Sequence, residues 1–75
     1  MNRIPLDSTI LAWVRYLPDI RLLQLGLCTG KDYEYFDVPG HIYSGLLASE
    51  SKGRYYNLQI RNEFRFQRIK KSTAS

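Results

Sequence analysis

The stretch at residues 51–61, SKGRYYNLQIR, combines residue types that could hold a phosphate group. A small polar residue before an apolar-periodic run is a common helix start, and the free N–H groups of a helix start attract anions. Lys52 and Arg54 add positive charge there, while Gly53 permits close approach to the backbone. The functional interpretation is a phosphate site. In the alternative, structural interpretation, Ser51 caps the helix, Gly53 lets two helices pack tightly, and the cations are solvated.

Tyrosines form a second candidate group. Tyr33 and Tyr35 share one face of a predicted strand, and Tyr55 lies in a predicted helix. Stacking an unpaired base on an aromatic ring contributes about 1–3 kcal/mol, so these rings could bind single-stranded nucleic acid. The alternative is that they pack beneath a helix. Trp13 alternates with Val14, so one of these two faces away from the core, and an exposed Trp13 would favour binding.

Positive charge is concentrated at the C-terminal end. Residues 1–50 carry four lysines and arginines against six acids, for a net charge of −2, whereas residues 51–75 carry seven against one, for +6. Such asymmetry indicates an anionic partner or, alternatively, a solvated basic surface. The expected contacts are Lys52, Arg54, Arg61, Arg65 and Arg68.

Residues suited to catalysis or metal binding are sparse. A metal site needs three or four ligands, and the single histidine, His41, and the single cysteine, Cys28, have no clustered partners. The acids Asp32, Glu34 and Asp37 line a predicted strand and helix start, where acids usually complement the helix dipole. Glycine-rich nucleotide loops are absent. We expect no enzyme, no metal and no cofactor.

The chain shows no targeting segment. One cysteine without a CxxC partner favours a reducing compartment. The N-terminus lacks the apolar stretch of a signal peptide, and no run of about 18 apolar residues could cross a membrane. These features predict a cytoplasmic protein without membrane association.

Alternation and turns predict three strands in one domain spanning residues 1–75. The first covers residues 9–16, with Ile10, Ala12, Val14 and Tyr16 on one face. Leu23, Leu25 and Leu27 share a face of the second strand, at residues 21–28. A tight turn at Thr29-Gly30, where glycine allows positive φ, leads to the third, at residues 31–37. Short turns between such strands are typical of an antiparallel meander.

The residues after the third predicted strand show the periodicity of helices. A helix begins at residues 37–39 with Pro39 in its first turn, and its predicted inner face is Ile42, Tyr43, Leu46 and Leu47. Gly45 would let this helix approach the sheet. A second short helix begins near Ser51, with Tyr56 and Ile60 one turn apart. Residues 64–69 form either a short edge strand or an extended tail, and residues 70–75 are predicted to be a disordered tail. The fold class is α+β: a three-stranded meander packed against two short helices.

From about Asp7 to Ile69, the chain resembles the KTSC domain, a family named after a C-terminal extension of some lysyl-tRNA synthetases. The resemblance rests on Asp7-Ser8, on Tyr16 followed by the alternating leucines, on Tyr33-Glu34-Tyr35-Phe36-Asp37-Val38-Pro39, and on Leu46-Leu47-Ala48 followed by residues 51–57 and Ile60. The chain departs from the family pattern at Leu27-Cys28 and Gly40-His41. The synthetase attachment implies an RNA partner by association.

Together these features predict a small non-enzymatic binding module that contacts RNA or another polyanion through its basic C-terminal third. Single-stranded or structured RNA is favoured over duplex DNA, because no segment resembles a helix that reads the major groove. The alternative is a protein–protein adaptor, encoded by a phage or mobile element, that docks through an exposed aromatic patch or a sheet edge.

Overall fold

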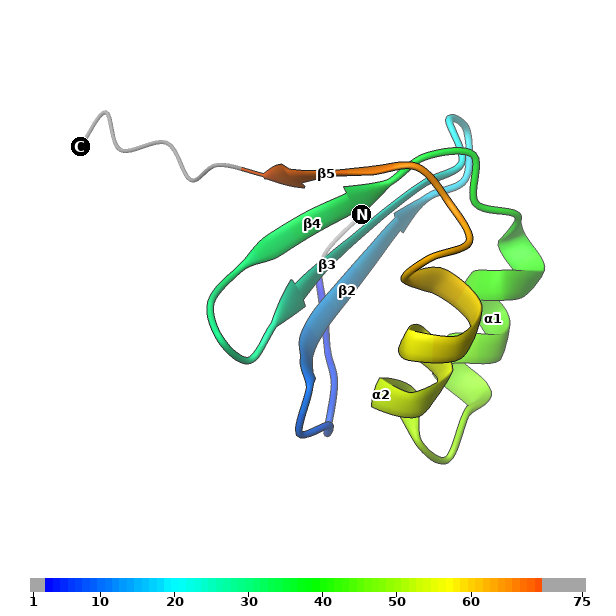
Figure 1. The fold of residues 1–75 in the computed structure, drawn as a ribbon. Helices are drawn as coiled ribbons and strands as arrows, with labels where there is room; N and C mark the ends of the chain where they lie inside the picture. The colour runs from blue at the N-terminus through cyan, green and yellow to red at the C-terminus, as the bar shows by residue number, and fades with distance from the viewer. Residues whose placement is uncertain (1–2, 70–75) are drawn as a thin grey trace.

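Residues 3–69 are described by a computed structural model, in which helices cover one face of a five-stranded antiparallel sheet (Figure 1). The α+β prediction is confirmed, and the predicted meander forms the centre of the sheet. The predicted disordered tail, residues 70–75, lies outside the described residues. The strands, in chain and spatial order, are β1 (Ile4–Pro5), β2 (Leu11–Leu17), β3 (Leu22–Leu27), β4 (Asp32–Tyr35) and β5 (Phe66–Ile69). The helices are α1 (Gly40–Ala48) and α2 (Lys52–Tyr55), which continues as a π-helical turn, η1 (Tyr56–Ile60).

Two edge strands extend the predicted meander. β1 pairs with β2 through Ile4 opposite Val14 and Pro5 opposite Trp13. Its two residues include a proline, so it carries no alternating pattern that could have revealed it. At the other edge β5 pairs with β4, with Phe66 opposite Tyr35. Residues 66–69 therefore form the edge strand, which was one of the two alternatives for this segment.

A β-bulge in β2 overturns the predicted alternation at its start. The register shifts between Leu11 and Trp13, so β2 holds one extra residue relative to β3. A bulge of this kind resets which face each side chain occupies. Leu11 is consequently buried beside Val14, whereas Ile10 is exposed. The predicted regular alternation of Ile10, Ala12, Val14 and Tyr16 on one face was therefore wrong at the start of the strand.

The core lies between the sheet and the helices. Leu23 and Leu25 are fully buried as predicted, Leu46 reaches them from α1, and Tyr56 and Ile60 reach them from η1. Leu47 was predicted on the same inner face but is exposed, because the inward-facing stripe of α1 ends at Leu46. The buried apolar residues are Leu11, Val14, Tyr16, Leu23, Leu25, Tyr35, Val38, Leu46, Tyr56 and Ile60.

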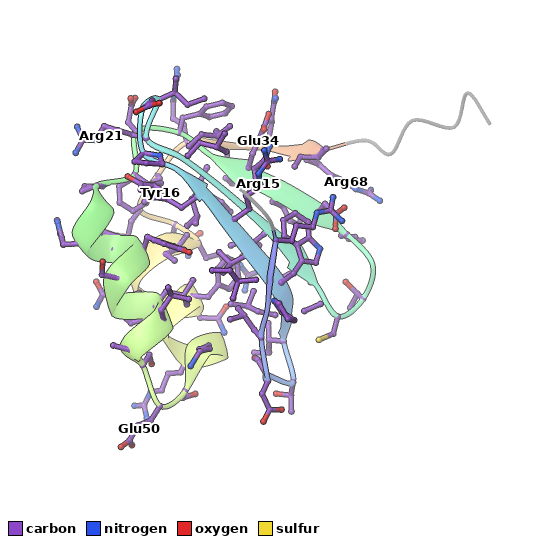
Figure 2. The ribbon with its side chains drawn as sticks, turned by 180° about the vertical axis from the view of Figure 1, so that it is seen from behind. Arg15, Tyr16, Arg21, Glu34, Glu50 and Arg68 are labelled. Atoms are coloured by element: carbon purple, nitrogen blue, oxygen red, sulfur yellow. The ribbon has the colours of Figure 1, made fainter. Side chains whose placement is uncertain are left out.

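The segment from β4 to α1 is anchored to the β2–β3 turn. The Val38 N–H donates to the Arg21 carbonyl at 2.9 Å, and the Tyr16 hydroxyl donates to the Val38 carbonyl at 2.6 Å. Figure 2 shows Tyr16 beside the start of α1, close to Arg21. Pro39 is the N-cap and not a first-turn residue, and Asp37 precedes it with φ 56°. Asp37 thus forms the turn and does not complement the helix dipole.

Candidate nucleic-acid interface

The predicted binding residues lie in separate parts of the molecule. Lys52, Gly53 and Arg54 are at the start of α2, directly after Glu50, whereas Arg68 is on β5. Figure 2 shows Glu50 and Arg68 at opposite ends of the molecule. The basic C-terminal third is therefore contiguous in sequence but divided in space.

The start of α2 borders a shallow depression of about 190 Å³. Its lining includes Lys52 and Arg54, but also the carboxylates of Asp7 and Glu50. Two acids beside two cations balance the charge. Because like charges repel, the carboxylates work against a bound phosphate.

Lys52 and Gly53 have structural partners in the fold. The Lys52 ammonium donates to the Ser49 carbonyl at 2.9 Å, just beyond α1. Gly53 is buried, and a Cβ there would lie 2.7 Å from Ile10 Cδ1. Gly53 was predicted to let the two helices pack tightly, and that prediction was wrong. The space beside Gly53 is filled by the side chain of Ile10, the residue before β2. Ser51 occupies the N-cap position of α2, but its hydroxyl makes no cap hydrogen bond, so the predicted cap was also wrong.

Tyr55 joins the two helices and is not free to stack on a base. Its hydroxyl donates to the Ile42 carbonyl of α1 at 3.0 Å. Gly45 lies directly beneath the ring, and a Cβ on Gly45 would collide with the Tyr55 hydroxyl and come 2.9 Å from Cζ. Gly45 therefore lets Tyr55 approach α1, and the prediction that it brings α1 close to the sheet was wrong.

A larger groove, of about 360 Å³, lies between the helix-facing side of the sheet and η1. It brings together the predicted Tyr33, Tyr35 and Arg61. Arg61 is the single charged residue of the lining, and no carboxylate faces it there. The complete lining is Ile10, Leu27, Tyr33, Tyr35, Tyr56, Asn57, Arg61 and Phe66.

Aromatic rings form much of the groove wall. Phe66 stacks on Tyr35 with centroids 5.2 Å apart and meets the edge of Tyr33 at 5.7 Å. Tyr35 is buried and Tyr33 half-buried, while Phe66 is 51% exposed. Phe66 thus offers an open ring face, and Tyr35 supports it from below. Partly open aromatic surface next to a guanidinium can accept a planar ligand.

The hydroxyls of Tyr35 and Tyr56 form a buried hydrogen bond of 2.6 Å. Burial raises the pKa of Tyr35 well above its usual range, and the bond to Tyr56 raises it further, while the nearby Arg61 charge acts in the opposite direction. The phenol therefore stays neutral and lines the groove as a polar but uncharged group. Tyr56, Asn57 and Phe66 were not predicted as site residues, because helical spacing assigned Tyr56 to the core and no local pattern distinguishes the other two.

Arg68 borders the same side of the sheet. It lies opposite Tyr33 in the β4–β5 ladder, and paired residues project to the same face. Arg68 is exposed, and the end of β5 lies away from the helices (Figure 1). Arg65, by contrast, lies 5.8 Å from the centroid of the Phe36 ring and does not line the groove.

The remaining candidates have structural partners. Glu34 accepts hydrogen bonds from Gln24 at 3.2 Å and from Gln67, across β3, β4 and β5. It therefore links strands, and it lies on a strand as predicted. Trp13, on the other face of the sheet from Val14, lies on Gly26, where a Cβ would come 2.6 Å from Trp13 Cδ1. The Arg3 guanidinium covers the Trp13 ring at 4.0 Å.

Side chains that could bind a metal ion are scattered over residues 3–69. Within that range no three or more histidine, cysteine, aspartate or glutamate side chains are grouped to hold a metal ion. His41 and Cys28 are both exposed. None of the helices in this part of the chain has the length and apolar character needed to span a bilayer.

Comparison with known proteins identifies relatives over nearly the whole chain. A protein from Tsukamurella paurometabola is 34% identical over 61 residues, covering 81% of this chain and 91% of the relative. An uncharacterised protein from Stutzerimonas stutzeri is 31% identical over 70 residues, covering 92% and 99%. A lysine–tRNA ligase from a Nostoc species is 35% identical over 65 residues, which are 87% of this chain but 11% of the ligase.

The structure and the family model agree with these relatives. The crystal structure of a KTSC domain protein from Yersinia pestis superposes with a TM-score of 0.87 at 28% identity, covering 92% of this chain and 97% of that one. The model of the KTSC domain matches residues 7–64, which include β2 to β4 and all the helices. The chain therefore belongs to the KTSC domain family.

Proposed function

We propose that this protein is a cytoplasmic binding module for single-stranded RNA and that one base enters the aromatic groove. The observation that carries the proposal is the open face of Phe66 beside Arg61, in a groove whose lining holds no acid. A base would stack on Phe66 and the edge of Tyr33. Arg61 and Arg68 would contact the phosphates on either side of it.

The proposal uses a narrower set of residues than the basic C-terminal third. Lys52 and Arg54 share their depression with Asp7 and Glu50. Gly53 and Tyr55 are occupied by packing against Ile10 and α1. The similarity to a segment of a lysine–tRNA ligase supports RNA as the class of partner.

The test is fluorescence-anisotropy titration of the protein against a labelled single-stranded RNA octamer of mixed sequence, at low and moderate salt. Arg61→Glu is compared with Arg54→Glu, which makes the same charge change at an exposed position outside the groove. We expect micromolar binding that Arg61→Glu weakens about tenfold or more and Arg54→Glu changes little. Equal losses in both variants would contradict the groove assignment, and no binding at low salt would contradict RNA binding.

A protein–protein adaptor is the second candidate, and the β5 edge favours it. β5 is the last strand of the sheet and pairs only with β4 among the described strands, and Phe66 on it is half-exposed. An unpaired edge can add a strand from another chain. Binding to a partner that persists at high salt, with no RNA binding at low salt, would select this candidate.

A further inference from the structure

We infer that Gly53 is a positioning residue for the aromatic groove and acts through Ile10, which closes one end of that groove. The inference rests on the proposed RNA-binding function. Residues 51–54 (SKGR) thereby have a role that their cations do not explain, since those cations share their depression with two acids. The role is steric, because Gly53 leaves the space that the Ile10 side chain occupies.

Ile10 forms the wall between two hollows of the surface. It lines both the groove of about 360 Å³ and the shallow depression of about 190 Å³ at the start of α2, and the two linings share no other residue. The Ile10 side chain is 37% exposed, whereas Gly53 is buried. One side of Ile10 therefore contacts α2, and the other side bounds the groove.

Strand register places Ile10 at the end of the groove away from Phe66. Phe66 lies opposite Tyr35, and the groove passes Tyr33, two residues away along β4. Leu27 lies one further pair of residues along the sheet, and the N–H of the next residue donates to the Ile10 carbonyl at 2.8 Å. Four residues of a strand span roughly 13 Å, which is close to the length of one nucleoside. The groove thus has an aromatic end and an aliphatic end, and Ile10 sets its length.

Gly53 leaves no spare room between α2 and Ile10. A Cβ at Gly53 would come 2.7 Å from Ile10 Cδ1 and 3.1 Å from Ile10 Cβ and Cγ1. Carbon atoms in contact are ordinarily about 3.5–4.0 Å apart, so Ile10 must move when a side chain is added at Gly53. Because α2 blocks movement toward the helix, the Ile10 side chain would shift into the groove and shorten it.

The experiment compares Gly53→Ala with Gly40→Ala by fluorescence anisotropy, using the labelled RNA octamer of mixed sequence. Gly40 is the matched control, because a Cβ there meets no atom within 4 Å. We expect Gly53→Ala to weaken binding about fivefold, the smaller end of what one stacked base contributes, and Gly40→Ala to leave binding unchanged. Unchanged affinity in a folded Gly53→Ala variant would overturn the inference.

A second substitution separates this steric role from a phosphate contact at Gly53. Ile10→Val removes Cδ1, the atom nearest to the added Cβ, so the double variant Gly53→Ala/Ile10→Val conserves the packed volume. We expect the double variant to bind within about twofold of the wild-type protein. If the alanine instead blocked a phosphate from the α2 backbone, Ile10→Val would restore nothing, and that result would overturn the inference.

Ile10→Ala tests the position of the wall without altering α2, so it stands even if Gly53→Ala does not fold. The shorter side chain lengthens the groove, and we expect the affinity for A8 RNA relative to U8 RNA to rise at least about threefold over the wild-type ratio. An unchanged ratio would overturn the placement of Ile10 at the end of the groove. Failure of the wild-type protein to bind any of these oligonucleotides would instead overturn the proposed function, and the inference with it.

Discussion

At the scale of single residues, tyrosine hydroxyls connect elements that are distant in sequence. Tyr16 in β2 bonds the Val38 carbonyl before α1, Tyr35 in β4 bonds Tyr56 in η1, and Tyr55 bonds Ile42. A buried hydroxyl needs such a partner. The motif around Tyr35 and Val38 is therefore largely structural, and Tyr33 is the member of this motif that remains half-open beside the groove.

Because the buried Tyr35 phenol stays neutral, we expect the free energy of unfolding to fall at high pH. Burial raises the pKa of Tyr35 in the folded state, whereas the unfolded side chain ionises near pH ~10. Unfolding at higher pH therefore releases a proton, and the free energy of unfolding falls as pH rises, by up to ~1.4 kcal/mol per unit from this residue. Urea denaturation at several pH values between about 9 and 11 measures this slope.

The double variant Tyr35→Phe/Tyr56→Phe is the control for that slope. It lacks the buried phenols, so its free energy of unfolding should decline less steeply over the same pH range. Some decline should remain, because burial also raises the pKa of Tyr43. Identical slopes for the two proteins would show that Tyr35 ionises with equal ease in the folded and unfolded states.

At the scale of elements, the contact between α1 and α2 depends on the absence of a side chain at Gly45, which leaves room for the Tyr55 ring. Alanine is ordinarily the better helix former by about 1 kcal/mol, yet a Cβ at Gly45 collides with Tyr55. Gly45→Ala should therefore lower the free energy of unfolding by about 1–3 kcal/mol. Urea denaturation gives the value.

Gly40 in the same helix provides the matched control. A Cβ there meets no atom within 4 Å, so Gly40→Ala should be neutral or stabilise the protein by a few tenths of a kcal/mol, up to about 1. If Gly45→Ala also stabilises the protein, Tyr55 can move away from α1 without cost, and the stability of the fold does not depend on the close approach of Tyr55 to Gly45.

At the scale of the whole molecule, the charge of the chain is divided between two ends and not gathered into one basic surface. Lys52 and Arg54 lie by Asp7 and Glu50, whereas Arg61 and Arg68 flank the groove side of the sheet. Binding through two phosphate contacts predicts a slope of log K against log salt near −1.4, from about −0.7 per contact with single strands.

The salt titration distinguishes the divided arrangement from a broad basic surface. Arg61→Ala should make the slope shallower by about 0.7, whereas the double variant Lys52→Ala/Arg54→Ala should leave it unchanged. A wild-type slope of about −3.5, from about −0.7 for each of Lys52, Arg54, Arg61, Arg65 and Arg68, would show that the basic C-terminal third acts as one surface.

Much of the fold follows from local features of the sequence. The alternating leucines predicted β3. The Thr29-Gly30 pair predicted the turn into β4, and Gly30 has the positive φ, 96°, that this turn requires. Tyr56 and Ile60, one turn apart, predicted the buried face of the last helical segment. These features could be predicted because turn conformation and side-chain direction depend on residues close together in the chain.

The site depended on contacts that no local pattern contains. The β-bulge in β2 redirects Ile10 toward Gly53 and the groove, and β5 brings Phe66 next to Tyr35 across some thirty residues. The sequence alone determined the family, the central meander and the residues available for binding. Tertiary structure alone decided that Arg61 joins the tyrosines while Lys52 and Arg54 face acids, because long-range strand pairing and helix packing set which distant side chains meet.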